Sequence, residues 1–204
     1  MSSSEEVARL VAAAAPRAGS TVVVAIDGPS GAGKTTFAEQ LRVALCALGR
    51  SCVVVHLDDL YPGWDGLDEV VPLTVAWILQ PLASGRPPRY HRYDWNAGRY
   101  DDWHDVELPL LGDPVLIVEG VGAGSRACRP YLASIVWVHA PDALRMERGL
   151  DRDGEAYRPH WERWAGQESA LFKRENTAAH ADVTIDGTWP GNAGTAPPGD
   201  TSPI

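Results

Sequence analysis

A glycine-rich turn between an apolar run and a helical pattern constrains the fold more than any other feature of the sequence. It lies in VVVAIDGPSGAGKTTFAEQL, from Val22 to Leu41. The β-branched run from Thr21 to Ile26 predicts a buried strand. From Lys34 to Leu48 the apolar residues fall on one face of a helix, which Gly49 can end. The sequence therefore predicts a strand, a glycine-rich loop and an amphipathic helix in succession.

Further strands and helices alternate along the rest of the chain. Four apolar runs predict buried strands: Cys52 to Leu57, Val115 to Gly120, Ser134 to Ala140 and Ala181 to Asp186. Helical patterns lie between most of them, at about 73–82, 143–150 and 161–174. Before all of these, Ser3 and Glu6 predict a capping box that opens a short helix. The alternation predicts an α/β fold with a parallel sheet that is covered on both faces.

Composition limits the domain count and the class of partner. The 204 residues suffice for one domain, expected over 1–187, and the tail over 188–204 is rich in Pro, Gly, Thr and Ala, which predicts disorder. The net charge of −9 argues against nucleic acid or an anionic membrane as partner. No apolar run approaches the ~18 residues of a membrane span. The three cysteines have no paired spacing, so a cytoplasmic protein with reduced thiols is expected.

The segment GPSGAGKT fits the phosphate-binding pattern G-x-x-x-x-G-K-[ST], with a strand before it and a helix after it. Its glycines let backbone N–H groups turn toward phosphate oxygens, and the following helix adds the positive end of its dipole. Lys34 can reach the outer phosphates, and the hydroxyl of Thr35 can join a Mg²⁺ shell. The residues expected to hold a nucleoside triphosphate are Gly28, Pro29, Ser30, Gly31, Ala32, Gly33, Lys34, Thr35 and Thr36.

Carboxylates follow two of the predicted strands. Asp58 and Asp59 come directly after the second strand, at the edge where open α/β sheets place their active sites. We favour Asp58, which comes first, as the base for an acceptor hydroxyl and as a magnesium ligand. Glu119 ends the third strand, where a carboxylate can hold Mg²⁺ together with Thr35. The guanine-reading pattern N-K-x-D of GTPases is absent, so these residues favour phosphoryl transfer to a hydroxyl.

Arginines at helical spacing follow the fourth predicted strand. Arg145, Arg148 and Arg152 lie three and four residues apart in DALRMERGLDRD. As a set they predict a lid, at about 143–160, that closes over the phosphates and neutralises charge during transfer. For any single arginine the alternative is a solvent-facing helix surface, with pairing to Glu147 and Asp151.

The segment over 84–111 is rich in Pro, Tyr, Trp, Arg and Asp and shows no sustained period. A connection of this length inside a compact domain is usually functional, which predicts an acceptor-binding insertion. Its aromatic rings can stack on an acceptor or form a small hydrophobic core beneath the segment. They belong to Tyr90, Tyr93, Trp95, Tyr100 and Trp103.

Five segments in this order resemble the uridine kinase and phosphoribulokinase family of P-loop kinases: GPSGAGKTT, DDLY, RYDW, VEG and RGLDRD. The resemblance extends over about 21–186. It implies a P-loop NTPase-type three-layer sandwich, with a mostly parallel five-stranded sheet, helices on both faces and a lid. It also implies ATP and Mg²⁺ as cofactors and a homo-oligomer, since members of the family are commonly oligomeric.

The resemblance also implies roles for individual residues. Asp58 corresponds to the catalytic base, and Tyr61 to a tyrosine near the acceptor. Glu119 corresponds to a residue that helps to hold magnesium. The acceptor segment and the lid arginines correspond to Tyr93, Asp94, Trp95, Arg148 and Arg152.

The partner implied is a small molecule with a hydroxyl group, and the family favours a nucleoside. Uridine kinases usually follow the acceptor segment with a histidine that helps to read the pyrimidine. This chain instead continues NAGRYDDW, with Gly98 at about that place. A sugar, a sugar acid, a vitamin precursor and a nucleoside monophosphate are therefore alternative acceptors. A non-catalytic nucleotide-binding regulator is the alternative from a different functional class.

Overall fold

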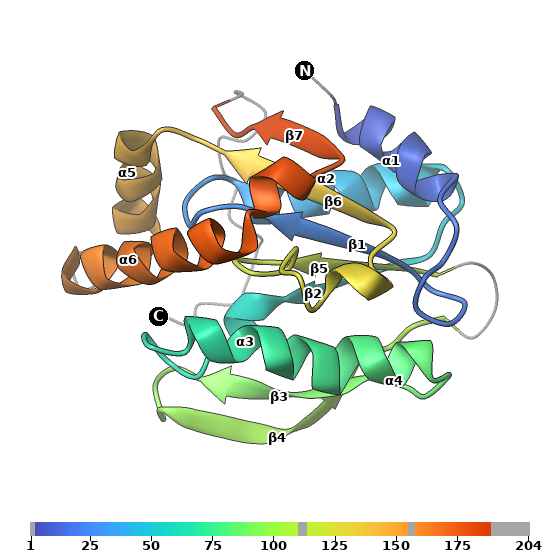
Figure 1. Cartoon of the computed structure of the whole chain (residues 1–204), viewed down its shortest axis with the longest axis horizontal. Helices are drawn as coiled ribbons and strands as arrows, with labels where there is room; N and C mark the ends of the chain where they lie inside the picture. The colour runs from blue at the N-terminus through green and yellow to red at the C-terminus, as the bar shows by residue number, and fades with distance from the viewer. Residues whose placement is uncertain (1–2, 110–113, 155–157, 189–204) are drawn as a thin grey trace.

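A parallel five-stranded sheet forms the centre of the computed structural model, which describes residues 3–109, 114–154 and 158–188 (Figure 1). The strands lie in the order β2-β5-β1-β6-β7, and every neighbouring pair is parallel. Their bounds are Val22–Asp27 (β1), Cys52–His56 (β2), Val115–Glu119 (β5), Ser134–His139 (β6) and Val183–Asp186 (β7). The five strands that the sequence predicts are confirmed.

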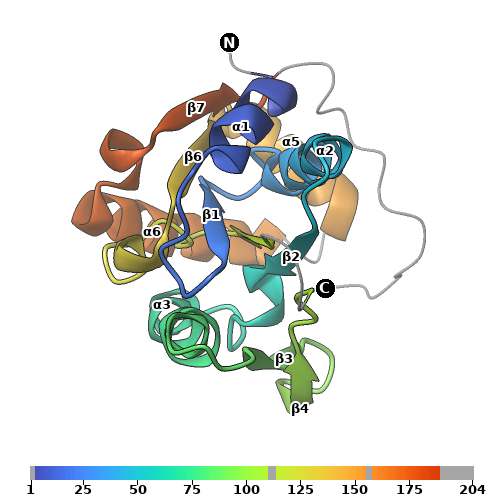
Figure 2. The ribbon, with the colours of Figure 1, turned by 90° about the vertical axis from the view of Figure 1, so that its right-hand side faces the viewer.

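Two helices cover one face of the sheet (Figure 2). α1 (Ser4–Ala12) packs against α2 (Lys34–Ala47). The predicted capping box is confirmed, because Ser3 Oγ accepts from the Glu6 N–H at 3.3 Å and the Glu6 carboxylate accepts from the Ser3 N–H at 2.9 Å. Alternate residues of the central strands, such as Val24, pack into this layer.

One long helical stretch and α6 (Arg158–Glu175) cover the opposite face. The stretch begins as α3 (Leu67–Thr74), passes through a π-helical turn (Val75–Leu79) and ends as α4 (Gln80–Ala83). Strand residues that alternate with those of the first layer, such as Val23, pack against these helices. The helices and the sheet therefore form the three-layer α/β sandwich that the sequence predicts.

The middle strand of the sheet leads into the glycine-rich loop. β1 lies between β5 and β6, and all six of its residues are buried. Burial on both faces explains why its sequence is a continuous apolar run rather than an alternating one. At the far side of β6 the chain continues into α5 (Asp142–Asp153), the first helix of the predicted lid. The segment predicted as a lid therefore begins at the carboxyl edge of the sheet, next to the loop.

The segment over 84–111 contains a β-hairpin. β3 (Arg89–Asp94) pairs antiparallel with β4 (Arg99–Asp105), and Gly98 lies in the turn with φ 64°. The hairpin lies outside the main sheet, beside α3 and α4 (Figure 1). Every residue of the two strands is exposed or half-buried. Polar side chains therefore occur on both faces, which hides the alternation that marks most strands.

The expected tail over 188–204 lies outside the described residues, except for Thr188. Within the three described ranges, no helix is both long enough and apolar enough to span a bilayer.

Candidate active site

The phosphate loop, residues 28–33, joins β1 to α2. Three of its glycines have positive φ, with 142° at Gly28, 73° at Gly31 and 97° at Gly33. A Cβ at Gly28 would lie 2.0 Å from the carbonyl oxygen of Val138, and one at Gly31 would lie 2.3 Å from that of Arg145. Glycine is therefore needed at these positions for two reasons. The backbone angles disfavour other residues, and at Gly28 and Gly31 a neighbouring carbonyl group leaves no room for a side chain.

The start of α2 offers hydrogen-bond donors to an anion. Its N-cap, Gly33, makes no side-chain capping bond, so the first N–H groups of the helix lack a capping side chain. Lys34 is buried, and its ammonium donates to the carbonyl oxygen of Pro29 at 3.1 Å. A curled loop, a helix N-terminus and an ammonium group at one place are suited to phosphate oxygens.

Glu119 meets the phosphate loop from the next strand. β5 pairs with β1, and Glu119 lies opposite Ile26. The carboxylate of Glu119 accepts from the Thr35 hydroxyl at 3.2 Å and lies 2.7 Å from Nδ1 of His56. Burial alone would raise the pKa of Glu119, but the His56 hydrogen bond and the charge of Lys34 hold it below its ordinary value. Glu119 therefore stays ionised at neutral pH.

Two oxygen atoms beside the phosphate loop suit a magnesium ion. Mg²⁺ prefers carboxylate and hydroxyl oxygens and completes its shell with water and substrate phosphates. Thr35 and Glu119 place such oxygens 3.2 Å apart at the start of α2. The described residues thus fit the predicted magnesium ion, with the side chains of Thr35 and Glu119 as its protein ligands.

The two aspartates after β2 have different surroundings. Both lie in a 3₁₀ turn (Leu57–Asp59) at the carboxyl end of the strand. Asp59 is tied to the hairpin, since its carboxylate accepts from Arg92 Nε at 2.9 Å and from the Tyr90 hydroxyl at 3.4 Å. Asp58 is exposed, and its carbonyl oxygen accepts from the Trp95 indole N–H at 3.1 Å. Asp58 thus lies at the carboxyl end of β2, as the sequence predicts. Its role as the base stays a prediction.

Tyr61 lies inside the molecule rather than on an open surface. Its side chain is 2% exposed, and its hydroxyl donates to the carbonyl oxygen of Val121 at 3.0 Å. The ring packs edge-on against Trp164, with 5.0 Å between centroids. Burial is the main cause that raises the pKa of Tyr61 well above its ordinary value. In this structure Tyr61 is part of the core, and contact with an acceptor stays a prediction.

The predicted acceptor segment lies where β3 enters the hairpin turn. The carboxylate of Asp94 accepts from the N–H groups of Asn96 and Ala97, both at 2.9 Å, and so orders the turn. Tyr93 packs edge-on against Trp95, with 5.4 Å between centroids. Asp94 therefore has a clear structural role, while the two aromatic residues line the end of the hairpin near Asp58.

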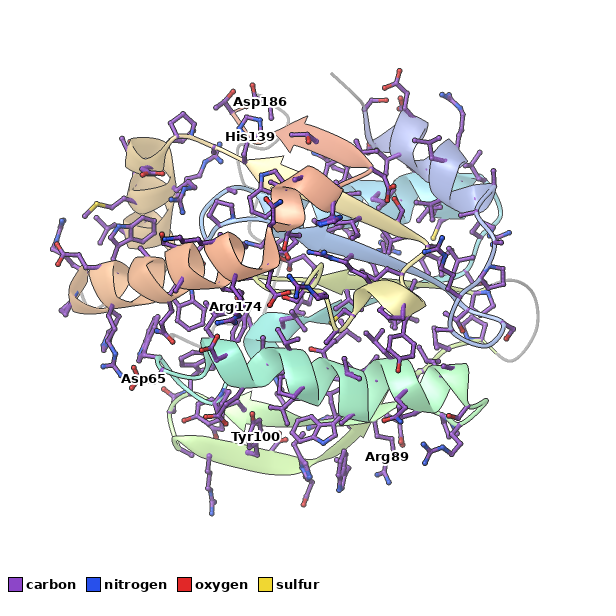
Figure 3. The ribbon with its side chains drawn as sticks, in the orientation of Figure 1. Asp65, Arg89, Tyr100, His139, Arg174 and Asp186 are labelled. Atoms are coloured by element: carbon purple, nitrogen blue, oxygen red, sulfur yellow. The ribbon has the colours of Figure 1, made fainter. Side chains whose placement is uncertain are left out.

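The aromatic residues of the hairpin form a small core with Trp77 of the π-helical turn. Trp77 lies 5.5 Å from Tyr100 and 5.6 Å from Trp103, and Tyr93 lies 5.3 Å from Tyr100, all between ring centroids. The Tyr100 hydroxyl also donates to the carbonyl oxygen of Leu60 at 2.7 Å, so the ring lies between the hairpin and the helical layer (Figure 3). These rings therefore pack against one another and against Trp77, although Trp103 is 44% exposed, and stacking on an acceptor stays a prediction.

Two of the three lid arginines contact the phosphate loop. Arg145 is buried and donates to the Ser30 carbonyl oxygen at 2.9 Å. Arg148 donates to the carbonyl oxygens of Gly31 at 3.4 Å and Gly187 at 3.0 Å. The side chain of Arg152 lies outside the described residues. For Arg145 and Arg148, α5 therefore directs the guanidinium toward the loop.

One buried residue beside the phosphate loop that the sequence patterns did not single out is Asp27, at the end of β1. It is fully buried, and its carboxylate accepts from the N–H groups of Gly28 at 2.7 Å, Gly122 at 2.9 Å and Gly124 at 2.9 Å. Burial is the largest influence and raises the pKa of Asp27 to about 6, although the three N–H groups lower it. Asp27 therefore joins the phosphate loop to the loop after β5. A charged residue at the end of an apolar strand was the available signal.

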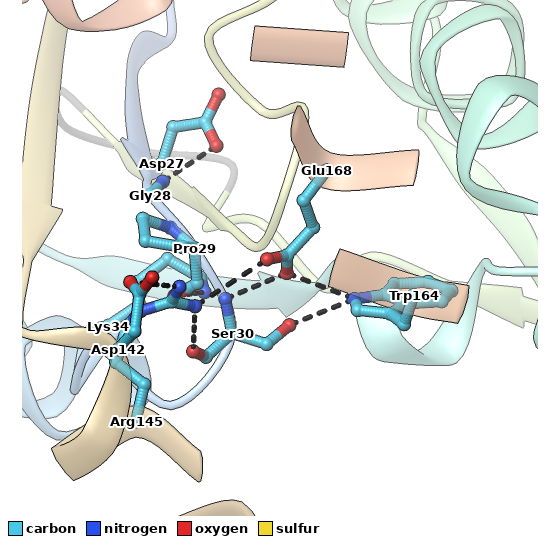
Figure 4. A network of polar contacts seen from close by, with 9 residues as sticks. All are labelled: Asp27, Gly28, Pro29, Ser30, Lys34, Asp142, Arg145, Trp164 and Glu168. Carbon is cyan, nitrogen blue, oxygen red and sulfur yellow. Dashed lines mark hydrogen bonds and ion pairs between the residues drawn. The ribbon is translucent and has the colours of Figure 1, made fainter. Parts of the chain in front are cut away.

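A second missed group comes from α6 and lies against Ser30 (Figure 4). The Glu168 carboxylate accepts from the Ser30 N–H at 2.8 Å, and the Trp164 indole N–H donates to Ser30 Oγ at 2.9 Å. No local pattern links residues so far apart in the chain, so the sequence offered no signal for this contact.

The same helix is tied to the residues that follow Asp58. Arg174 pairs with Asp68 of α3 at 2.8 Å, and Arg163 pairs with Asp65 (Figure 3). The side-chain amide of Gln167 donates to the carbonyl oxygen of Trp64 at 2.7 Å. α6 thus contacts both the phosphate loop and the segment between β2 and α3.

Comparison with known sequences identifies one distant relative. No known protein-family profile matches the chain. The inorganic pyrophosphatase TTM1 of Arabidopsis thaliana is 28% identical over 145 residues, which cover 66% of this chain and 22% of that protein. The chain thus spans about a fifth of the length of this curated relative.

Solved structures share the fold over nearly the whole chain. A possible uridine kinase from Bacillus stearothermophilus is 23% identical, with a TM-score of 0.65, and the match covers 90% of this chain and 97% of that one. A protein from Silicibacter sp. TM1040, provisionally described as a fructose transport system kinase, is 18% identical, with a TM-score of 0.57 and coverage of 91% and 100%. The chain therefore has the fold of the P-loop kinases related to uridine kinase.

Proposed function

We propose that the protein is an ATP- and Mg²⁺-dependent phosphotransferase that acts on a hydroxyl group of a small molecule, with a nucleoside as the favoured acceptor. One observation carries the proposal. The phosphate loop, Glu119 and Asp58 follow or end β1, β5 and β2, which are adjacent parallel strands. Their carboxyl ends meet at one edge of the sheet, so the phosphate loop and the two carboxylates lie at the same edge, which supports their proposed roles as phosphate cradle, metal ligand and base.

Residues of the phosphate loop bind the donor in this mechanism. Backbone N–H groups of Gly31 and Gly33 to Thr36, with the Lys34 ammonium, hold the phosphates of ATP, while the N–H groups of Gly28 and Ser30 donate to Asp27 and Glu168 and keep the loop in shape. Thr35 and Glu119, with Asp58 nearby, would hold Mg²⁺. Magnesium neutralises charge on the phosphate oxygens when it is bound. The arginines of α5, Arg148 and Arg152, then stabilise negative charge on the phosphoryl group during transfer.

Asp58 handles the proton of the acceptor. Its carboxylate accepts the hydroxyl proton while the hydroxyl oxygen bonds to the terminal phosphorus, and the bond to the bridging oxygen breaks to give ADP. Tyr61, Tyr93, Asp94 and Trp95 would position the acceptor beside Asp58, either by contact or through the hairpin. The products are the phosphorylated acceptor, ADP and a proton that Asp58 returns to solvent.

The acceptor class is the least constrained part of the proposal. The two solved structures carry different names, one a possible uridine kinase and the other a fructose transport system kinase. A sugar, a sugar acid, a vitamin precursor or a nucleoside monophosphate is therefore tested beside nucleosides. The net charge of −9 supports a small molecule over nucleic acid or a membrane. A cytoplasmic location and a homo-oligomer complete the proposal, and light scattering tests the latter.

The name of the Arabidopsis relative suggests a second candidate function. Hydrolysis of inorganic pyrophosphate also needs a cradle for two linked phosphates, and the phosphate loop offers one. Pyrophosphate hydrolysis needs no acceptor other than water. The two functions therefore differ in whether an added alcohol stimulates turnover.

A panel of acceptors with Mg·ATP decides between these functions. Phosphoryl transfer predicts ADP release that depends on one class of acceptor, and the phosphorylated product is identified by mass spectrometry. Phosphate release from pyrophosphate alone would instead favour the second candidate. Tight Mg·ATP binding without turnover of any compound would indicate a nucleotide-binding regulator.

The variant Asp58→Asn tests the base. We expect turnover to fall by about 10²–10⁴-fold, because a general base contributes this much, while the Kd for Mg·ATP stays within about twofold. Asp59→Asn is the matched control, since Asp59 contacts Arg92 of the hairpin. It should mainly raise the KM for the acceptor. Unchanged turnover in Asp58→Asn would refute the role of Asp58.

A further inference from the structure

Side chains from α5 and α6 bind all three polar groups of Ser30 (Figure 4). Its N–H donates to Glu168 at 2.8 Å, and its Oγ accepts from the Trp164 indole N–H at 2.9 Å. Its carbonyl oxygen accepts from Nη1 of Arg145 at 2.9 Å. We call Glu168, Trp164 and Arg145 the Ser30 contact group. One residue of the phosphate loop is thus held by two elements that come more than 100 residues later.

The members of the Ser30 contact group are buried and bonded to one another. Glu168 is 3% exposed, Trp164 5% and Arg145 7%. The Trp164 N–H also donates to Glu168 at 3.0 Å, and Nη1 of Arg145 lies 3.6 Å from the Glu168 carboxylate. Asp142, at the surface, pairs with Nη2 of Arg145 at 2.8 Å. The buried carboxylate therefore has one cation and two N–H donors against it, which offset the cost of its burial.

The residues after Ser30 are packed just as closely. A Cβ on Gly31 would lie 2.3 Å from the carbonyl oxygen of Arg145. A Cβ on Gly187 would lie 1.9 Å from the carbonyl oxygen of Ala32. Three successive loop residues are thus in contact with α5, α6 or the end of β7. The N–H groups at the start of α2 follow directly, so a rotation of the Ser30 peptide would redirect them.

We propose that Glu168 is a positioning residue of the phosphate loop. The Glu168 carboxylate accepts from the Ser30 N–H and so fixes the orientation of this peptide group. It also keeps the Arg145 guanidinium beside the loop. In this proposal Glu168 acts through Ser30 and Arg145, which it contacts, rather than through the nucleotide. The inference rests on the proposed function in one respect, that Mg·ATP is the ligand of the loop. It adds to that function a residue of α6, Glu168, that holds the loop in its binding conformation before Mg·ATP binds.

Hydrogen–deuterium exchange in the nucleotide-free protein tests the positioning directly. We expect Glu168→Ala to speed exchange of the Ser30 amide by about tenfold or more, because the amide loses its acceptor. Glu168→Gln keeps an acceptor oxygen but loses the charge facing Arg145, so its rate should lie between those of Glu168→Ala and wild type. Glu162→Gln, an exposed glutamate on the same helix, is the matched control and should exchange within about twofold of wild type.

Calorimetric titration with Mg·ATP then tests the consequence for binding. We expect the Kd to rise about tenfold in Glu168→Ala and less in Glu168→Gln, with Glu162→Gln unchanged. Trp164→Phe keeps the ring and loses its N–H donor, so it should give a smaller rise of the same kind. Thermal unfolding of each variant separates these effects from lost stability.

Two outcomes would overturn the proposal. One is a Ser30 amide that exchanges at the wild-type rate in folded Glu168→Ala. The other is a lowered unfolding midpoint with an unchanged Kd, which would make Glu168 a purely structural residue. Wild-type protein that fails to bind Mg·ATP would contradict the proposed function instead, and the exchange experiment would still decide the role of Glu168.

Discussion

The region around the phosphate loop and the hairpin differ in how deeply their charged residues are buried. Around the phosphate loop, the charged residues Asp27, Lys34, Glu119, Arg145 and Glu168 are all buried, and each has a bonded partner. In the hairpin every residue of both strands is exposed or half-buried, and its ion pairs face solvent. A buried charge tolerates little change, because a lost partner leaves it uncompensated. The phosphate-loop region is therefore rigidly specified, whereas the hairpin can vary at small cost.

The sharpest test of this difference is Gly31→Ala in the phosphate loop. An added Cβ would collide with the Arg145 carbonyl oxygen, and the backbone has φ 73°. We expect the affinity for Mg·ATP to fall by about a hundredfold or more, measured by calorimetry. Gly49→Ala is the matched control, since Gly49 has φ 77° and nothing within 4 Å of the added atom. Equal effects of the two variants would show that backbone angle alone, and not contact with α5, matters.

The next largest effect concerns the buried carboxylate of Asp27. Burial raises its pKa from 3.8 to about 6, so between these values the folded protein binds more protons than the unfolded chain. The free energy of unfolding should therefore fall as pH rises from about 4 to 6.5, by about 3 kcal/mol, and this part should be missing in Asp27→Asn. Urea unfolding of both proteins across this range measures the difference. Parallel pH curves would contradict the raised pKa of the buried Asp27 carboxyl.

A smaller effect is expected from the hairpin itself. Tyr100→Phe removes the hydrogen bond to the Leu60 carbonyl oxygen and should lower the free energy of unfolding by about 1 kcal/mol. The Kd for Mg·ATP should stay within about twofold of wild type. Tyr131→Phe changes a half-buried tyrosine outside the hairpin and serves as the control. A large loss of Mg·ATP affinity in Tyr100→Phe would show that the two regions are coupled after all.

The smallest effect should come from the ion pair on the hairpin surface. Asp105→Asn breaks its contact with Arg89 at 2.7 Å, where the two side chains are 67% and 49% exposed (Figure 3). Exposed pairs of this kind contribute little, so the free energy of unfolding should change by less than about 0.5 kcal/mol. A change above about 1 kcal/mol in urea unfolding would place this pair with the buried charges and weaken the contrast between the regions.

Some features of the phosphate-loop region could be predicted from the sequence, whereas the hairpin and one long-range contact could not. Local patterns sufficed for the capping box of Ser3, the apolar strand before Gly28 and the pairing of Glu119 beside β1. The hairpin was not recognised as paired strands, because polar side chains lie on both of its faces and hide the alternation that marks most strands. The contact between Ser30 and Glu168 could not be found either, since it depends on how α6 packs across the finished sheet.

The position of β1 in the sheet also sets an order for assembly during synthesis. β1 is made early, yet its two neighbours begin at Val115 and Ser134. Until Val115 has left the ribosome, β1 has neither of the strands that flank it in the finished sheet. Its apolar residues also lack α6, which is made later and helps to cover one face of the sheet. We expect the nascent chain to depend on chaperones in this interval and to become protease-resistant only after β6 is complete.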